Sequence, residues 1–291
     1  MVSSIGLLVF LIGLVAAVLA AAFSISKTDL DPIEPRLEER WLVRLVSRSP
    51  RLADFVGRRL DRRTAGGLFL TVGFLVVIGL SVFVATTFDM IAGEFGLARF
   101  DLGIAEFGAA RAGTATAEIQ ALFTHLGGNT VITAVTVATS GWGWWRYRDP
   151  QVALFMFVVV LGQAALTTGL KWIVARDRPD LEQLAPWSGS SFPSGHTAAA
   201  AATYAAIALV LTLRSSWTAR GIAAGAAAFA AIGVAATRAL LGVHWFTDVL
   251  AGLAVGYGWF VVCAIAFGGR IMRFGEPVDE VAVASGGKAP T

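Results

Sequence analysis

Long apolar runs separated by short polar segments form the main pattern of this 291-residue chain. An uncharged apolar run of about 20 residues is long enough to cross a bilayer as a helix. Runs of roughly this length predict membrane-spanning helices at residues 5–23, 67–88, 129–145, 151–174, 197–213, 220–241 and 246–267. The predicted fold class is therefore all-α, in the form of a polytopic membrane helix bundle.

The composition agrees with a membrane protein rather than a soluble one. Hydrophobic residues make up 56% of the chain and charged residues 15%, whereas a soluble domain usually carries about 25% charged residues. The mean hydropathy is +0.70. The 32 glycines suit closely packed membrane helices, in which small residues let backbones approach. The single cysteine, Cys263, allows no internal disulfide.

The first apolar run admits two interpretations. Ala20, Ala21 and Ala22 resemble a site of signal-peptide cleavage, but Met1–Ser4 lacks the basic region with which a signal peptide begins. We therefore expect residues 1–26 to form a retained N-terminal transmembrane helix.

Two polar segments lie outside the remaining spans. Residues 27–66 hold ten basic and seven acidic residues, and are either an amphipathic helix pair on the membrane surface or a solvated cytosolic connector. Residues 269–291 are polar and contain Gly and Pro, which is typical of a flexible tail. Residues 67–268 remain as one predicted membrane domain.

Basic residues predict the orientation of the spans, because they are enriched on the cytoplasmic side. If residues 27–66 are cytoplasmic, alternation places the turns that contain Arg146, Arg214 and Arg270 on the same side. Segments 89–128, 175–196 and 242–245 then lie outside. The sequence thus predicts a multi-pass protein of a bacterial plasma membrane.

Three polar clusters interrupt the apolar pattern at the predicted outer ends of spans. Lys171, Arg178 and Pro179 form the first cluster, and Pro193-Ser194-Gly195-His196 forms the second. Two basic side chains at a helix end can also be explained as lipid-facing residues that extend to headgroups. Ser194 is an N-cap candidate, and the amides of the helix that it begins could bind a phosphate. A plain serine-capped helix with an incidental histidine is the alternative.

The third cluster contains Arg238, His244 and Asp248 after Thr237. His244 and Asp248 are four residues apart, so they share a face if a helix begins there. A carboxylate beside a histidine fixes its tautomer. A charge inside a membrane costs about 2.5–3.5 kcal/mol at the helix centre, which makes Asp248 a functional candidate, although a structural ion pair is the alternative.

Taken together, the clusters supply the groups that phosphoryl transfer requires. Cations neutralise the phosphoryl oxygens, while one histidine can attack and the other can protonate the leaving oxygen. No carboxylate cluster or Cys/His set indicates a metal site. The 89–128 segment is predicted to be a mixed loop, and the third histidine, His125, is interpreted as an ordinary residue of this loop.

The three clusters resemble the three motifs of the type 2 phosphatidic acid phosphatase family, which shares its site with vanadium haloperoxidases and glucose-6-phosphatase. The resemblance implies a six-helix phosphatase core within 67–268, preceded here by one extra transmembrane helix. It implies that His244 is the nucleophile, that Asp248 orients it and that His196 is the acid and base. It further implies phosphate binding without metal or cofactor by Lys171, Arg178, Ser194, Gly195 and Arg238. Thr237 departs from the family, in which serine is commonest before the arginine.

The predicted function is therefore that of a membrane lipid phosphatase with its site on the outer side. Its substrate would be phosphatidic acid, phosphatidylglycerol phosphate or undecaprenyl diphosphate. We expect membrane lipids as its other partners, and no nucleic acid. A phosphotransferase that uses the same phosphohistidine is one alternative. A non-catalytic transporter is another, but it would place polar residues at mid-depth in the spans. The oligomeric state is not indicated by the sequence.

Overall fold

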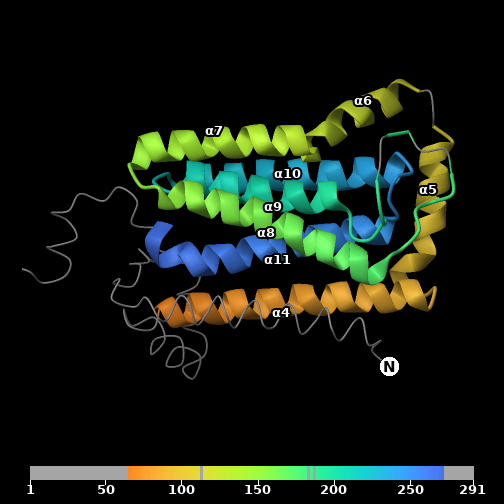
Figure 1. Ribbon diagram of the computed structural model, residues 1–291, viewed down its shortest axis with the longest axis horizontal. Coiled ribbons are helices and arrows are strands. Elements are labelled where there is room, and N and C mark those ends of the chain that lie inside the picture. Colours follow the sequence, from red (N-terminus) through yellow and green to blue (C-terminus); the bar gives the residue numbers. More distant parts are fainter. Residues whose placement is uncertain (1–64, 112–113, 182–183, 186–187, 272–291) are drawn as a thin grey trace, which may run out of the picture.

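The computed structural model describes residues 65–271, except for 112–113, 182–183 and 186–187 (Figure 1). The predicted helix in 1–26, nearly all of the 27–66 connector and nearly all of the 269–291 tail lie outside the described residues. Throughout the described part, the regular elements are α-helices and short 3-10 helices, so the predicted all-α bundle is confirmed.

Each of the six predicted spans in this region corresponds to one long helix. The helix predicted at 151–174 has the same bounds in the structure, and the others differ by up to four residues at an end. In chain order these helices are α4 (Ala65–Ala92), α7 (Asn129–Tyr147), α8 (Gln151–Val174), α9 (Gly195–Leu211), α10 (Trp217–Leu240) and α11 (Phe246–Ile271).

The 89–128 segment is largely helical, although the sequence pattern predicted a mixed loop. It contains η1 (Gly96–Phe100), α5 (Asp101–Ala109), α6 (Ala115–Phe123) and η2 (Thr124–Gly127). The side chain of Thr114 caps α6 by accepting from the amide of Ala117, which is a recognised helix-start signal. Aromatic and polar residues alternate too irregularly here to produce a helical period, so the pattern concealed these short helices.

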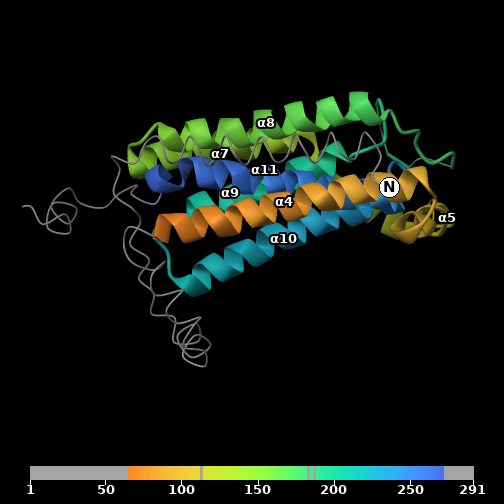
Figure 2. The same cartoon turned by 90° about the horizontal axis from the view of Figure 1, so that it is seen from below.

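Helix α9 lies at the centre of the bundle. It packs against α7, α8, α10 and α11, while α4 covers the far side of α11 (Figures 1 and 2). The alanines of α9, including Ala198 and Ala202, are fully buried. Their small side chains allow four neighbouring helices to approach one central helix closely.

The crossing of α9 and α11 is especially close. A Cβ atom at Gly256 would clash with the carbonyl oxygen of Ala198, and one at Gly252 would lie 2.8 Å from the carbonyl oxygen of Ser194. Both glycines therefore face the beginning of α9. This contact brings the first turns of α9 and α11, which carry parts of the second and third polar clusters, to the same place.

Helix lengths and hydropathies agree with a membrane location. Within the part of the chain that the structure describes, four helices are long and apolar enough to cross a bilayer, and a fifth span is obtained if α6–η2 and α7, which meet at 47°, are counted together. Helix α9 is shorter, at 17 residues. Large apolar side chains such as Leu161 and Phe229 are exposed on the outside of the bundle, as expected for surfaces that face lipid.

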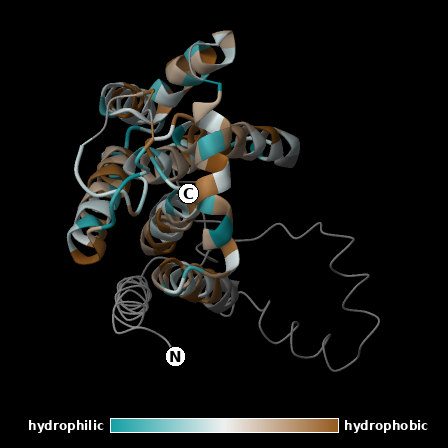
Figure 3. Cartoon of the chain, turned by 90° about the vertical axis from the view of Figure 1, so that its right-hand side faces the viewer, coloured by the Kyte–Doolittle hydropathy of each residue, from teal (hydrophilic) through white to brown (hydrophobic). Residues whose placement is uncertain are grey.

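Helix α5 runs across one end of the bundle, nearly perpendicular to the long helices (Figure 1). Viewed from this end, hydrophilic and hydrophobic residues alternate along it (Figure 3). Phe100, Leu102 and Phe107 are exposed, and the Arg111 guanidinium lies 3.4 Å from the centre of the Phe107 ring. Exposed aromatic and basic side chains on such a helix are typical of the boundary between a membrane and water.

Two glycines of α11 offer a matched test of the helix crossing. We expect Gly256→Ala to destabilise the protein, because its Cβ atom would clash with the α9 backbone. Gly258→Ala should be neutral or stabilising, because its Cβ atom would lie 3.6 Å from Leu80 and alanine favours a helix by about 1 kcal/mol. Thermal unfolding of the purified proteins in detergent measures both. Equal unfolding midpoints would contradict the close crossing.

Candidate functional site

The three polar clusters converge at the end of the bundle that α5 crosses. Helix α8 ends at Val174, and Ala175 adopts a left-handed conformation (φ 46°) that turns the chain out of the helix. Arg178 consequently lies in the loop after α8. Lys171 remains in the last turn of α8.

Lys171 and Arg178 nevertheless meet, because both donate hydrogen bonds to the carbonyl oxygen of Ser190. The Arg178 guanidinium also donates to the carbonyl oxygens of Gly189 at 3.0 Å and Ser188 at 2.9 Å. Four donations to three consecutive carbonyls thus fix the 188–190 loop against the two cations. This loop leads directly into the second cluster.

The second cluster begins α9. Ser194 occupies the predicted N-cap position, but its side chain does not cap the helix. Its hydroxyl oxygen accepts from the hydroxyl of Thr197 at 2.9 Å, and its amide donates to the carbonyl oxygen of Asp248 at 3.0 Å. A Cβ atom at Gly195 would lie 4.0 Å from the Lys171 side chain. The first amides of α9 are therefore close to this lysine, in the arrangement that a phosphate needs.

The third cluster occupies the turn from α10 to α11. Gly242 has a φ of +70°, a conformation that glycine adopts without steric cost. His244 lies in this turn and α11 begins at Phe246, so His244 precedes the helix that carries Asp248. The two side chains still meet, with His244 Nδ1 3.6 Å from Asp248 Oδ2, and both are buried.

The contacts of His244 determine which ring nitrogen carries its proton. Arg178 Nη1 lies 3.3 Å from His244 Nε2. A guanidinium only donates hydrogen bonds, so Nε2 must be the accepting nitrogen and Nδ1 must carry the proton of the neutral ring. The Nδ1–H group then faces the Asp248 carboxylate, and the Nε2 lone pair faces the cations.

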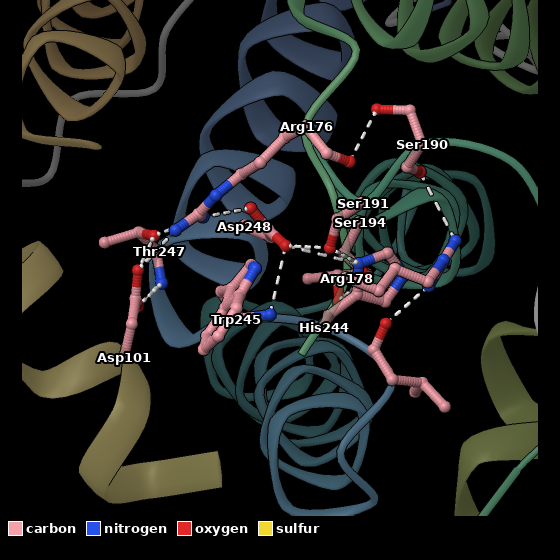
Figure 4. A network of polar contacts seen from close by, with 12 residues as sticks. Asp101, Arg176, Arg178, Ser190, Ser191, Ser194, His244, Trp245, Thr247 and Asp248 are labelled. Atoms are coloured by element: carbon pink, nitrogen blue, oxygen red, sulfur yellow. Dashed lines mark hydrogen bonds and ion pairs between the residues drawn. The ribbon is translucent and has the colours of Figure 1, made fainter. Parts of the chain in front are cut away.

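The carboxylate of Asp248 is fully enclosed and has partners from three segments (Figure 4). Its Oδ2 atom accepts from the hydroxyl of Ser191 and from the amide of Trp245 at 3.0 Å. Its Oδ1 atom accepts from Arg176 Nη1 at 2.6 Å. The Ser191 hydroxyl also lies 3.4 Å from His244 Nδ1, so it lies against both members of the pair.

Three of these neighbours were missed by reasoning from the sequence. Arg176 lies inside the first motif and Ser191 lies two residues before the second, so the pattern of polar residues near the clusters could have indicated both. Asp101 belongs to the network through Arg176 and Thr247, but it is 146 positions from Thr247. No local signal in the sequence relates it to the site.

The remaining predicted residues lie at the same end. Arg238 is buried near the end of α10, and His196 is half-buried in the first turn of α9. The charge of Arg238 and the ring of His244 both act electrostatically on His196. The hydroxyl of Thr237 donates to the carbonyl oxygen of Val234 at 2.8 Å. The residue that departs from the family pattern thus uses its hydroxyl within its own helix.

Burial determines the protonation of the loop residues in the site. It lowers the pKa of His244 to about 4, although the Asp248 carboxylate acts in the opposite direction, and Arg178 and Arg238 lower the pKa further. Burial also lowers the pKa of Arg178, which Asp248 partly offsets. The site at neutral pH therefore combines a neutral His244 with a charged guanidinium.

Over the residues described here, no three His, Cys, Asp or Glu side chains gather in a way that could hold a metal ion. The groups that do gather are cations, backbone amides and a histidine–carboxylate pair. Such a set can bind and polarise an anion such as phosphate. The fold and the site together define a membrane helix bundle with a cation-rich polar site at one end.

Comparison with known proteins identifies the family. The sequence model of the PAP2 superfamily matches residues 151–272. Phosphatidylglycerophosphatase B of Bacillus subtilis (strain 168) is 34% identical over 162 residues, which are 54% of this chain and 77% of that protein. A lipid A 1-phosphatase of Rhizobium johnstonii is 33% identical over 127 residues, or 40% of this chain and 48% of that protein.

A solved structure extends the likeness to the fold. The crystal structure of a transmembrane PAP2 type phosphatidylglycerolphosphate phosphatase from Bacillus subtilis superposes with a TM-score of 0.61 at 28% identity. The match covers 68% of this chain and 98% of that one. The protein belongs to the PAP2 superfamily, so the family that the three motifs predicted is confirmed.

The protonation of His244 can be measured directly, because the chain has only three histidines. We expect the ring nitrogens of His244 to titrate with a midpoint near pH 4, since burial opposes its charged form. Nitrogen-15 NMR of histidine-labelled protein in detergent gives the titration, and His244→Asn identifies the signal by its loss. A midpoint near the unperturbed value of about 6.5 would contradict the buried, neutral ring.

Proposed function

We propose that this protein hydrolyses the phosphate group of a membrane lipid through a phosphohistidine intermediate on His244. Its family and its phosphatase relatives make it a lipid phosphate hydrolase. The proposal beyond this class concerns the role of each residue, the lipids that react and the side of the membrane. The observation that carries it is the orientation of His244, with Nδ1 toward Asp248 and Nε2 toward Arg178.

In this proposal the cations and the α9 amides bind the phosphate. Lys171, Arg178 and Arg238 neutralise its oxygens, and the amides at Ser194 and Gly195 donate to them at the positive end of the helix dipole. Arg178 supports this role because it already lies 3.3 Å from His244 Nε2. A phosphoryl group held by this guanidinium would therefore have its phosphorus atom next to the lone pair that attacks it.

The first chemical step forms a bond between His244 Nε2 and phosphorus and breaks the bond between phosphorus and the lipid oxygen. His196 gives its proton to the departing oxygen, which leaves as an alcohol. The positive charge that develops on His244 is stabilised by Asp248, toward which Nδ1–H points. The product of this step is a phosphohistidine on a ring that cannot rotate away from its carboxylate partner.

The second step reverses these roles. His196, now neutral, takes a proton from a water molecule as the water oxygen attacks phosphorus. The bond between His244 Nε2 and phosphorus breaks, and inorganic phosphate is released. His196 ends the cycle protonated and His244 neutral, so the site is restored without a metal or cofactor.

The proposed substrates carry a phosphate or diphosphate on a lipid. The named relatives act on phosphatidylglycerol phosphate and lipid A, which share a phosphate attached to a lipid body. Phosphatidic acid and undecaprenyl diphosphate present the same headgroup chemistry. A site at one end of a bundle with lipid-facing helices suits such molecules, because the phosphate can reach the cations while the chains stay in the bilayer.

We further propose that this end of the bundle faces the outside of a bacterial plasma membrane. The opposite end carries Arg146, Arg148 and Arg214, and basic residues favour the cytoplasmic side. Helix α5, with the exposed Phe107 and with the exposed Phe100 just before it, would then lie in the outer headgroup layer.

Phosphate release by purified protein in detergent, with EDTA present, tests the proposed chemistry. We expect wild type to release phosphate from at least one of phosphatidylglycerol phosphate, phosphatidic acid and undecaprenyl diphosphate. His244→Ala should lower the rate by about a thousand-fold or more, because the attacking atom is lost. Glu118→Ala is the control, since this exposed residue of α6 should keep its rate within about two-fold.

Three outcomes would count against this chemistry. Hydrolysis that persists in His244→Ala would remove His244 as the nucleophile, and inhibition by EDTA would contradict the metal-free mechanism. Transfer of the phosphate to a lipid or sugar acceptor, with no inorganic phosphate formed, would identify a phosphotransferase instead.

Cysteine labelling tests the proposed orientation. In a Cys263→Ala background, Glu118→Cys places a thiol on α6 at the site end and Arg214→Cys places one in the turn between α9 and α10. Both positions are exposed, whereas Cys263 is buried. A membrane-impermeant maleimide should label Glu118→Cys in intact cells and Arg214→Cys only after permeabilisation. The reverse pattern would place the site in the cytoplasm.

A further inference from the structure

Arg176 connects two buried carboxylates at the site end of the bundle (Figure 4). Its Nη1 atom lies 2.6 Å from Asp248 Oδ1, and its Nη2 atom lies 2.7 Å from Asp101 Oδ2. The three side chains are 15%, 0% and 6% exposed respectively. The two ends of one guanidinium fork therefore hold one carboxylate each, in an environment where screening by water is weak.

Asp101 is in turn fixed to the first turn of α11. Its Oδ1 atom accepts from the amide of Thr247 at 2.9 Å, and its Oδ2 atom accepts from the hydroxyl of Thr247 at 2.7 Å. The same hydroxyl oxygen accepts from Arg176 Nη1 at 2.9 Å. Asp101 thus satisfies an amide at the beginning of the helix that carries Asp248, although it comes from α5 across the end of the bundle.

We propose that Asp101 and Arg176 are positioning residues for the reaction of His244, and that Asp101 acts through Arg176. They hold the Asp248 carboxylate in the one orientation in which Oδ2 faces His244. Neither residue contacts the phosphate in this assignment. The inference rests on the proposed function for its catalytic consequence, but the arrangement of Asp248 and His244 can be measured without turnover.

The geometry explains why two residues are needed. Without these partners the Asp248 carboxylate could rotate about its last side-chain bond, and the plane of the group would no longer direct an oxygen at His244 Nδ1. Ser191 and the Trp245 amide hold Oδ2, while Arg176 holds Oδ1, so both oxygens have separate partners. The planar Arg176 guanidinium is fixed in one orientation when its other end is also bound, and Asp101 supplies that contact.

The charges of the three side chains also indicate that both Arg176 and Asp101 are needed. Arg176 alone beside Asp248 would neutralise the carboxylate that must stabilise the positive His244 ring during phosphoryl transfer. Asp101 restores one negative charge to the group, so that Asp248 can still act on the imidazolium. The contact between α5 and α11 consequently has a catalytic role as well as a structural one.

A double-mutant cycle tests whether Asp101 acts through Arg176. Asp101→Asn removes the charge but keeps the shape, and Arg176→Lys keeps the charge but loses the fork that reaches two carboxylates. We expect each substitution to lower kcat by about 10-fold, as losses of such supporting partners often do. The double variant should also lose about 10-fold, rather than the hundred-fold that independent effects would give.

Two further readouts separate positioning from general damage. Inhibition by inorganic phosphate should stay within about two-fold of wild type in all three variants, because the phosphate-binding groups are unchanged. The nitrogen-15 shifts of the His244 ring should change in each variant, and Asp101→Asn should add no further change in the Arg176→Lys background. The nitrogen-15 shifts test the positioning role even if no lipid tested is hydrolysed.

Exposed residues of the same segment provide matched controls. Glu106→Gln removes a carboxylate of α5 and Arg99→Lys replaces an arginine of η1, and both should leave kcat and the His244 shifts at wild-type values. A hundred-fold loss in the double variant would show that the two residues act separately. Unchanged His244 shifts, or phosphate inhibition that fails together with kcat, would overturn the positioning role.

Discussion

The burial of one carboxylate, Asp248, is the constraint on which the site end of this protein depends. Removing a charged group from water costs several kcal/mol unless its partners replace the lost hydration. Asp248 meets this cost with the amide of Trp245, three residues away, and with two contacts from distant parts of the chain: Ser191 before α9 and Arg176 after α8. These contacts join the end of α8 to the beginnings of α9 and α11. The three helix ends are therefore fixed relative to one another.

The packing of the bundle makes these contacts geometrically possible. Gly252 and Gly256 allow α11 to approach the beginning of α9, and the Ser194 amide then donates to the carbonyl oxygen of Asp248. Ser194 of the second motif is thus hydrogen-bonded to the backbone of the third. A wider crossing would separate the α9 amides from the His244–Asp248 pair, so the small residues of the interface also determine the dimensions of the site.

The sequence predicted the helices well, because they depend on local pattern. The 151–174 helix was predicted with its observed bounds, since a continuous apolar run between two polar turns leaves little freedom. His244 and Asp248 lie together, as their spacing predicted. However, His244 lies in the turn before α11 and not on the helix itself. Asp101 could not be predicted, because its pairing with Thr247 and Arg176 depends on the placement of α5 across the bundle end. Residues 89–128 were interpreted as a loop, and the position of a loop aspartate in space, and hence its partners, cannot be predicted from the sequence.

The charges of the site show why an anion should complete it. Asp101 and Arg176 offset each other, so Asp248 contributes one negative charge, whereas Lys171, Arg178 and Arg238 contribute three positive charges. With both histidines neutral, two positive charges remain, which matches the charge of a phosphate monoester near neutral pH, and the proton that His196 donates in the first step adds a third. Like charges held together in a partly buried site repel one another, and a bound dianion relieves that repulsion. The buried carboxylate pair therefore has two consequences: it orients the nucleophile, and it leaves the cations with a charge that phosphate balances.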